Sequence, residues 1–536
     1  MARWDTEIFR QLPTEARWAC FTKGVLGVGS HHKGSGARRG LFASIGVGVG
    51  ALTAYDLTQR THSILRNYPV AGHMRYALES IRPELQQYFI ERNFDGRPFD
   101  RDTRTVVYSR AKGQEIGKAF GSERDLEEPG YNFLVHSNAP VEPSGPEPRV
   151  RLGGPECSRP YDISLLNISA MSFGSLSARA VRAMNKGAAM GGFAQDTGEG
   201  GLTDYHLEYG ADLMWELGTG YFSARTPDGH LDRDEFRRKA QMDEVKAITI
   251  KISQGAKPGM GGMLPGAKVN AEIARYRGVP EGEDCLSPSA HKEFSTPIEL
   301  VEFIAELRRL SGGKPVGFKI CFGSRREVLS ICKAIIDAGS GPDYILVDGS
   351  EGGTGAAPQE FTDHVGMPLR EGLITLHNAL TGSGLRDTIS IGASGKVAQG
   401  NDIVRRLIQG ADFTMSARAM MMATGCIQAQ KCHTGKCPVG VATQSARRQR
   451  ALDVVDKGER VRRYHEATIA EARRIMGAMG ASRPSQLDTT MLRQVLSPIA
   501  SSSYAEIYEW LSPGQLLDSP PESWAADWAH ARADSF

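Results

Sequence analysis

Apolar runs alternate with helical patterns through the middle of the chain. Most runs are followed by glycine or small polar residues and then by helically spaced apolar residues, as over residues 326–338 and 402–408. The eight runs cover residues 163–168, 192–195, 213–217, 247–252, 316–321, 344–347, 389–391 and 413–415. Eight strand–helix repeats predict an α/β fold, a (β/α)₈ TIM barrel over residues 160–445, with long insertions at 253–300 and 349–387. An open doubly wound sheet is the alternative, which the number of repeats disfavours.

The segments that flank the predicted barrel have other patterns. Residues 1–150 are predicted to be an N-terminal accessory region with helical periodicity over residues 62–91, and the proline- and glycine-rich residues 137–160 a linker. Residues 446–536 are predicted to be a C-terminal helical extension that begins with an amphipathic helix at 457–479. We expect Trp510, Trp524 and Trp528 in this extension to be packing residues.

One stretch of the accessory region, residues 40–55, carries no charge and contains four glycines. Its sixteen residues are fewer than the ~20 that a membrane-spanning helix needs, so a buried glycine-rich segment is the favoured interpretation. A membrane-associated segment is the alternative, because Lys33, Arg38 and Arg39 precede the stretch and would form its basic flank in the cytoplasm.

Composition narrows the class of protein. The 536 residues include 64 Lys+Arg and 62 Asp+Glu, so the net charge is +2 and we expect no nucleic-acid partner. Glycine is frequent, at 61 residues, which fits βα turns that approach a phosphate but also a protein rich in loops. The start lacks an apolar run, so the eight cysteines are expected to stay reduced, in the cytoplasm.

Three of the cysteines, Cys426, Cys432 and Cys437, fall within twelve residues, with five and then four residues between them. Three thiolates without a well-placed fourth suit a [3Fe-4S] cluster, which has three irons to ligate. A structural zinc site with His433 as fourth ligand is the alternative, although zinc sites usually have closer cysteine spacing. Three structural thiols without a metal are also consistent with the spacing.

The predicted strand ends carry candidate chemistry, because active sites of such barrels lie at the C-terminal ends of the strands. Glycine-rich turns at residues 392–396 and the turn at 416–418 follow the last two strands, where barrels commonly bind a phosphate. Lys319 lies within an apolar strand, and would face either a flavin ring or a carboxylate partner. Lys257 lies on a glycine-hinged loop, where it would pair with a substrate carboxylate or remain solvated.

Together these residues resemble the FMN-binding synthase domain of glutamate synthase, over about residues 160–480. The matches occur in order along the chain, at Met-Ser-Phe-Gly-Ser (171–175), Thr-Gly-Glu-Gly-Gly (197–201), Gln-Gly-Ala-Lys-Pro-Gly (254–259), Gly-Gly-Thr-Gly-Ala (352–356) and the cysteine loop (426–444). The resemblance implies FMN and a [3Fe-4S] cluster on a barrel that reduces 2-iminoglutarate, made from 2-oxoglutarate and ammonia, to glutamate.

The resemblance also assigns roles to residues. It implies that Cys426, Cys432 and Cys437 ligate the cluster, and that Gln254, Lys257, Arg277 and Ser295 bind the 2-oxo acid. It implies cofactor contacts for Met171, Ser172, Gly174, Thr197, Lys319, Gly353, Ser394, Gly395, Ser416 and Ala417.

The chain departs from the family pattern at three points. Met260 and Met263 replace an acidic residue and a glutamine of the substrate loop, and a thioether cannot donate a hydrogen bond to a carboxylate. The start, Met1-Ala2-Arg3, does not match the glutaminase domain, so ammonia or a separate glutaminase would supply nitrogen. We find no dinucleotide fingerprint, so ferredoxin or a separate reductase subunit would supply electrons.

Other functions stay open beside glutamate synthesis. The chain could be an FMN oxidoreductase for a different or N-substituted amino acid, or a non-catalytic electron-transfer subunit. Lys257 and Arg277 favour catalysis, and we expect a homo-oligomer.

Overall fold

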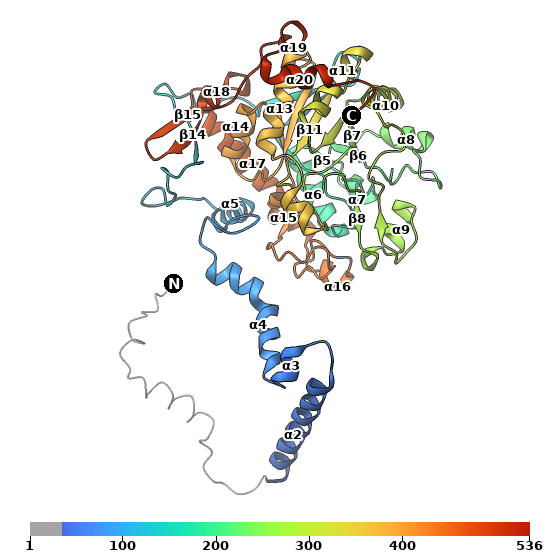
Figure 1. The fold of residues 1–536 in the computed structure, drawn as a ribbon, viewed down its shortest axis with the longest axis vertical. Coiled ribbons are helices and arrows are strands. Elements are labelled where there is room, and N and C mark those ends of the chain that lie inside the picture. Colours follow the sequence, from blue (N-terminus) through green and yellow to red (C-terminus); the bar gives the residue numbers. More distant parts are fainter. Residues whose placement is uncertain (1–34) are drawn as a thin grey trace. The chain divides into compact units, whose positions relative to one another are not determined.

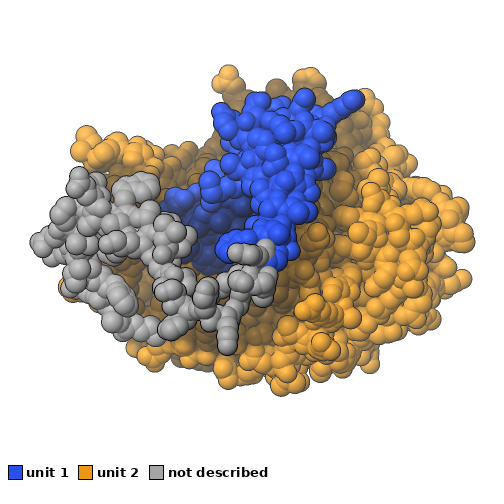
Figure 2. All heavy atoms as spheres, turned by 90° about the horizontal axis from the view of Figure 1, so that it is seen from below, with its two compact units in different colours: residues 1–90 blue, residues 91–536 orange. Residues whose placement is uncertain are grey.

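The computed structural model describes residues 35–536, with side chains from residue 40. The chain divides into two compact units, residues 1–90 and residues 91–536, which are coloured separately in Figure 2. The predicted accessory region ended at residue 150, whereas residues 91–150 belong to the unit that contains the barrel. Cys20 and Lys33 lie outside the described residues.

The first unit is helical where it is described. Its elements are α2 (Ser35–Thr58), α3 (Ser63–Asn67), α4 (Gly72–Leu85) and the π-helix η2 (Gln86–Ile90), so the helical periodicity predicted over residues 62–91 is confirmed. The uncharged stretch at 40–55 lies inside α2 and is exposed. Its interpretation as a buried segment is therefore wrong, because the described residues of this unit form no second layer that could cover α2.

In the second unit, eight parallel strands of the described chain close into a barrel, which confirms the predicted fold (Figure 1). The strands are β4 (Leu166–Ile168), β5 (Gln195–Asp196), β6 (Leu213–Leu217), β7 (Val245–Lys251), β10 (Val316–Ile320), β11 (Tyr344–Asp348), β12 (Ser390–Ser394) and β13 (Phe413–Ser416). They neighbour one another in chain order, and β13 pairs with β4 to close the ring.

Helices surround the strands. They are α6 (Ala178–Gly191), α7 (Asp204–Leu207), α8 (Arg233–Ala240), α10 (Pro297–Leu310), α11 (Arg325–Ala338), α13 (Leu369–Gly382), α14 (Gly400–Ile408) and α15 (Arg418–Thr424). Local sequence sets their starts, as at α10, where Thr296 and Glu299 form a reciprocal capping box. Leucines, isoleucines and valines on their inner faces are buried against the strands.

The two long crossovers carry extra elements. The first contains β8 (Met263–Leu264), η3 (Gly266–Lys268), α9 (Ala271–Arg277) and β9 (Cys285–Leu286), and β8 pairs with β9. The second contains α12 (Gln359–His364) before the barrel helix α13. The second insertion is therefore shorter than predicted, because its last part is one of the regular helices.

The predicted linker is partly ordered structure. β2 (Arg149–Leu152) and β3 (Tyr161–Ser164) form an antiparallel pair. Leu152 and Ile163 are fully buried and pack with residues from the first halves of barrel strands, such as Met214 and Phe413. This pair therefore closes the end of the barrel opposite the C-terminal ends of the strands.

The C-terminal extension begins with helices and continues as a mixed structure. Its elements are α16 (Ala446–Gln449), α17 (Val454–Ala478), the 3₁₀ turns η4 (Pro484–Gln486) and η5 (Thr489–Met491), β14 (Leu492–Ser497), β15 (Ala500–Ser503), α18 (Tyr504–Ile507), α19 (Gln515–Asp518) and α20 (Glu522–His530). The predicted long helix is confirmed as α17, which packs against α6, α14 and α5 (Arg101–Ala111). β14 and β15 form a sheet with β1 (Asn132–Leu134), so this region is not wholly helical. Trp524 is buried, and Trp510 and Trp528 pack against the core.

Candidate active site

A cleft lies at the C-terminal ends of the barrel strands and encloses about 490 Å³, including the open space at its mouth. Seven predicted site residues line it, which are Gln254, Lys319, Gly353, Ser394, Gly395, Ser416 and Ala417. They come from separate strand ends and from the loop after β7, and the closure of the barrel brings them together. A hydrogen bond from Ser394 Oγ to Asp348 Oδ1 (2.8 Å) links two neighbouring strand ends.

Lys319 lies in this cleft on β10 and forms an ion pair with Glu216 of β6. Both side chains are buried, and Asp196 of β5 is buried beside them. Burial alone lowers the pKa of Lys319, but the carboxylates of Glu216 and Asp196 outweigh it and raise that pKa above its ordinary value. Lys319 is therefore a fixed cation that lines the cleft and pairs with a carboxylate, and its contact with a flavin ring stays a prediction.

The turns after β12 and β13 give one end of the cleft a positive charge. Lys396 and Arg418 line this end, and Arg418 lies over the ring of Phe99, with 5.0 Å from its guanidinium carbon to the ring centroid. Burial lowers the pKa of both, and Arg418 lowers the pKa of Lys396 further. A Cβ on Gly353 would lie 2.8 Å from Arg418 Nε, so glycine is needed there. An anion bound at this end would offset both partly buried charges.

The turn after β4 holds three further predicted residues, Met171, Ser172 and Gly174. The turn after β5 packs closely against it, because a Cβ on Gly198 would lie 2.6 Å from the backbone N of Ser172. Gly200 N–H donates to Ser172 Oγ at 3.0 Å. Thr197 is buried, and its Oγ1 accepts a hydrogen bond from Glu216 N–H, so it supports the strand that presents the partner of Lys319.

The loop after β7 brings Lys257 into a buried position. Lys257 Nζ donates to the backbone oxygen of Ala356 at 3.0 Å, and burial lowers the pKa of Lys257 to about 8. Within the described part of the chain, Lys257 has no carboxylate at salt-bridge distance. The nearby Glu199 pairs with Lys251 instead, at 2.9 Å. Burial raises the pKa of Glu199, but Lys251, Lys257 and Arg277 outweigh it and lower that pKa to about 2.

Arg277, at the end of α9, is buried beside Gly174. Its Nη2 donates to the backbone oxygen of Phe173 at 3.1 Å, and its Nε is buried without a hydrogen-bond partner. Like Lys257, Arg277 has no carboxylate at salt-bridge distance in residues 35–536. The exposed hydroxyl of Ser295 donates to Glu299 at the start of α10. Of the four residues predicted to bind the 2-oxo acid, Gln254 lines the cleft, whereas Lys257, Arg277 and Ser295 do not. Contact with a 2-oxo acid stays a prediction for all four.

The cysteine loop lies against the turn after β4. Gln444 Nε2 donates to the backbone oxygens of Gly174 and Leu176, both at 2.9 Å. Lys268 Nζ donates to the backbone oxygen of Ser175 at 2.7 Å and reaches that of Cys432 at 3.4 Å. The loop is therefore attached to residues that adjoin the cleft.

The three thiols of the loop are close enough to interact. Burial, with smaller contributions from Cys432 and Cys437, raises the pKa of Cys426 to about 12. In the described chain, no group of three or more His, Cys, Asp or Glu side chains is arranged to hold a metal. Three thiols are suitable donors for an iron–sulfur cluster, but the side chains of Cys426, Cys432 and Cys437 do not adopt a ligating arrangement here.

Several site residues were not assigned from the sequence. They are Lys396, Arg418, Glu216 and the Lys251–Glu199 pair. Glu216 and Lys251 had a usable signal, because each is a charged residue inside an apolar strand, as Lys319 is. Which cation meets which carboxylate depends on the strand order, because Glu216 on β6 and Lys319 on β10 lie on either side of β7.

The comparisons with known proteins assign the chain to a family. Residues 155–482 match the family model described as "Conserved region in glutamate synthase". The chain belongs to the glutamate synthase family. The residues that match this family of oxidoreductases form the barrel, most of the cleft and the first part of the C-terminal extension.

Relatives match over different shares of their length. The glutamate synthase large subunit-like protein YerD of Bacillus subtilis (strain 168) is 39% identical over 451 residues, which cover 76% of this chain and 85% of YerD. A glutamate synthase large subunit-like protein of Rhizobium meliloti (strain 1021) is 30% identical over 63% of this chain and 77% of its own. The archaeal glutamate synthase (NADPH) of Methanocaldococcus jannaschii is 35% identical over 58% of each chain. The chain thus spans little more than half of that archaeal enzyme.

Proposed function

We propose that this chain is an FMN and iron–sulfur oxidoreductase, which reduces an imino acid formed from a 2-oxo acid and ammonia to an amino acid. The observation that carries the proposal is the cleft itself. A basic end and a buried lysine line the cleft, and two further buried cations, Lys257 and Arg277, donate to the loops after β11 and β4 at the same end of the barrel.

The cleft has the donors that FMN needs. Lys396, Arg418 and the glycine-rich turns after β12 and β13 suit the phosphate of FMN, and Lys319 suits the side of the flavin ring that becomes negative on reduction. FMN would supply two electrons and a proton to the substrate. FMN is favoured over FAD because the basic turns would bind a terminal phosphate, and FMN ends at its phosphate.

Lys257 and Arg277 suit the carboxylates of a 2-oxo acid. Each is buried, and in the described residues neither has a carboxylate partner, so a substrate carboxylate would balance its charge. Gln254 lines the cleft and could orient the oxo group. In the overall reaction ammonia condenses with the carbonyl, whose oxygen leaves as water, and the resulting C=N gains two electrons and two protons.

The cysteine loop suits an electron relay. Cys426, Cys432 and Cys437 would ligate a [3Fe-4S] cluster. The hydrogen bonds from Gln444 to Gly174 and Leu176 would hold that cluster beside the turn after β4, which would contact the flavin. Ferredoxin or a separate reductase subunit would deliver electrons, and ammonia or a separate glutaminase would deliver nitrogen.

The experiment is to purify the full chain without oxygen, identify the released flavin, and measure iron and acid-labile sulfide. The reduced protein is then given 2-oxoglutarate and ammonia, and glutamate is measured. We expect FMN, about three irons per chain and glutamate formation. Lys257→Met should abolish glutamate formation, whereas Lys292→Met, on an exposed loop, should leave it unchanged. FAD, zinc without sulfide, or no amino-acid product from any 2-oxo acid would refute the respective part of the proposal.

A further inference from the structure

Helix α2 of the first unit exposes an apolar surface on all sides. Seven of its large apolar side chains are exposed, which are Leu41, Phe42, Ile45, Val47, Val49, Tyr55 and Leu57. The segment Gly40–Thr58 has 19 residues and a mean hydropathy of 1.4, long and apolar enough to cross a membrane. Water is a poor solvent for such a surface, because monomeric soluble proteins rarely expose contiguous apolar patches of this kind.

The few hydroxyl groups on α2 are satisfied within the helix. Ser44 Oγ donates to the backbone oxygen of Gly40, Thr53 Oγ1 to that of Val49 and Thr58 Oγ1 to that of Ala54, each at 2.8 Å. A polar group in hydrocarbon costs several kcal/mol unless it is hydrogen-bonded. These three hydroxyls therefore need no water, and among residues 40–58, whose side chains are described, every Ser and Thr is satisfied within the helix.

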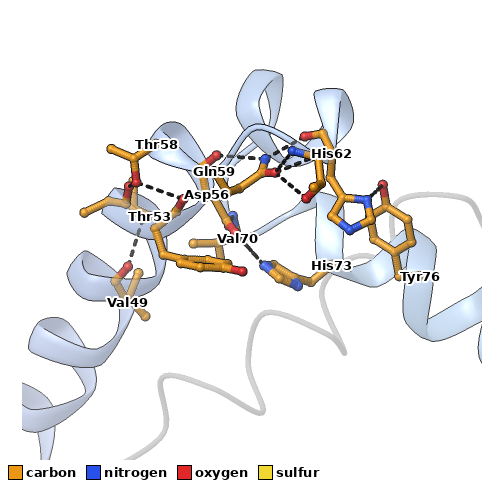
Figure 3. Close-up of polar contacts among 12 residues, drawn as sticks. Val49, Thr53, Asp56, Thr58, Gln59, His62, Val70, His73 and Tyr76 are labelled. Carbon is orange, nitrogen blue, oxygen red and sulfur yellow. Dashed lines mark hydrogen bonds and ion pairs between the residues drawn. The ribbon is translucent and has the colours of Figure 1, made fainter.

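The first charged residue after the uncharged stretch, Asp56, is compensated at the C-terminal end of α2 (Figure 3). Its carboxylate accepts hydrogen bonds from Val70 N–H at 2.8 Å and from His73 Nε2 at 2.9 Å. The Gln59 side chain closes the same turn, since its Oε1 accepts from His62 N–H at 2.7 Å. Polar contacts thus gather at one end of α2 and fix the start of α4 there.

Helix α4 carries a second uncovered apolar surface. Met74, Leu78, Ile81 and Leu85 recur at helical spacing and are all exposed. Arg75 and Glu79 pair elsewhere on the helix surface, at 2.8 Å. An amphipathic helix of this kind suits the boundary between lipid headgroups and acyl chains.

We propose that the first unit anchors this protein to a lipid bilayer, with α2 inserted across it and the apolar face of α4 on its surface. The 19 residues Gly40–Thr58 extend about 28 Å, at ~1.5 Å per residue, close to a hydrocarbon core of about 30 Å. Asp56 and its partners then lie at the headgroup level, where Tyr55 also suits the interface. The polar turn at this end connects the inserted helix to α4.

The test uses the full chain and its membrane fraction. Membranes from expressing cells are washed with alkaline carbonate, and the purified protein is floated with vesicles of phosphatidylcholine and phosphatidylglycerol. The variant carries Ile45→Lys and Val49→Lys in the middle of α2, where both side chains are already exposed. The matched control carries Leu496→Lys and Ile499→Lys, two exposed apolar residues of the barrel unit.

We expect the wild type and the control to stay in the washed membranes and to float with vesicles. Each lysine in α2 should lower the inserted fraction about 100-fold, so the α2 variant should be released. A wild type found in the carbonate supernatant, or an α2 variant retained like the control, would overturn the proposal. So would a soluble oligomer of the wild type that the α2 variant breaks into monomers, or a purified protein whose first residue lies after Thr58.

Discussion

The buried ion pair between Lys319 and Glu216 makes a stability prediction that does not depend on any cofactor. Lys319→Met removes the cation and leaves Glu216 and Asp196 buried beside each other. Breaking a buried ion pair by removing one partner costs about 3–5 kcal/mol, because the remaining charge has lost its compensation. We therefore expect Lys319→Met to lower the free energy of unfolding by that amount.

A double-mutant cycle separates the pair from simple loss of packing. Lys319→Met combined with Glu216→Gln should recover most of the lost stability, since the neutral pair leaves one buried carboxylate, Asp196, instead of two. The coupling free energy should exceed about 2 kcal/mol. The exposed pair Arg238–Glu235 is the matched control, for which Arg238→Met and Glu235→Gln should couple by about 0.2–1 kcal/mol.

The stability lost in Lys319→Met should depend on pH. Burial and Glu216 raise the pKa of Asp196 well above its ordinary value, whereas Lys319 opposes this rise. Without Lys319 this pKa rises further, so the folded variant holds a proton on Asp196 to higher pH than the folded wild type does. The variant then loses stability relative to the wild type as pH rises between the two folded-state pKa values, by about 1.4 kcal/mol per pH unit, so the deficit should be larger at pH 8 than at pH 5.

The assay is urea unfolding of cofactor-free protein, followed by far-ultraviolet circular dichroism at pH 5 and pH 8. Equal midpoints for the wild type and Lys319→Met at pH 8 would contradict the prediction. So would a double variant that is less stable than either single variant, because the two side chains would then contribute independently.

Three further predictions concern binding. Burial lowers the pKa of Lys257 to about 8, so 2-oxo acid affinity, measured by calorimetry, should fall tenfold per pH unit above about pH 8, and Lys257→Arg should remove this fall up to pH 10. Arg418→Met should weaken FMN binding about 10- to 150-fold in a flavin fluorescence titration, whereas the exposed Arg237→Met should not, and equal affinities would exclude Arg418 from the phosphate site. Met263 adjoins Gly262, which packs against Glu199, and a glutamine can donate a hydrogen bond that a methionine cannot. Met263→Gln should therefore tighten 2-oxoglutarate binding about 10- to 150-fold. Tight binding by the unmodified chain, with no gain from Met263→Gln, would show that the methionines do not change the substrate.

The sequence by itself determined the barrel. Its eight short apolar runs, each followed by a turn and a helical pattern, were enough because buried parallel strands need nearly continuous apolar residues and short strands leave clear boundaries. The long helix α17 was predicted for a similar reason, since an amphipathic pattern of that length has no strand alternative. Seven cleft residues were also found, because motif positions at strand ends all point to one end of a barrel.

The tertiary structure decided what depends on neighbours that are distant in the sequence. Lys319 on β10 meets Glu216 on β6, two strands away in the barrel, and the cysteine loop reaches the turn after β4 through Gln444. No local pattern specifies either contact. The exposure of α2 also depends on what the folded chain places around it. An apolar stretch with four glycines is compatible with a protein core or with lipid, and only the absence of a covering layer in the described residues distinguishes them. Local sequence fixes the element and its polarity, whereas burial and charge pairing are properties of the assembled chain.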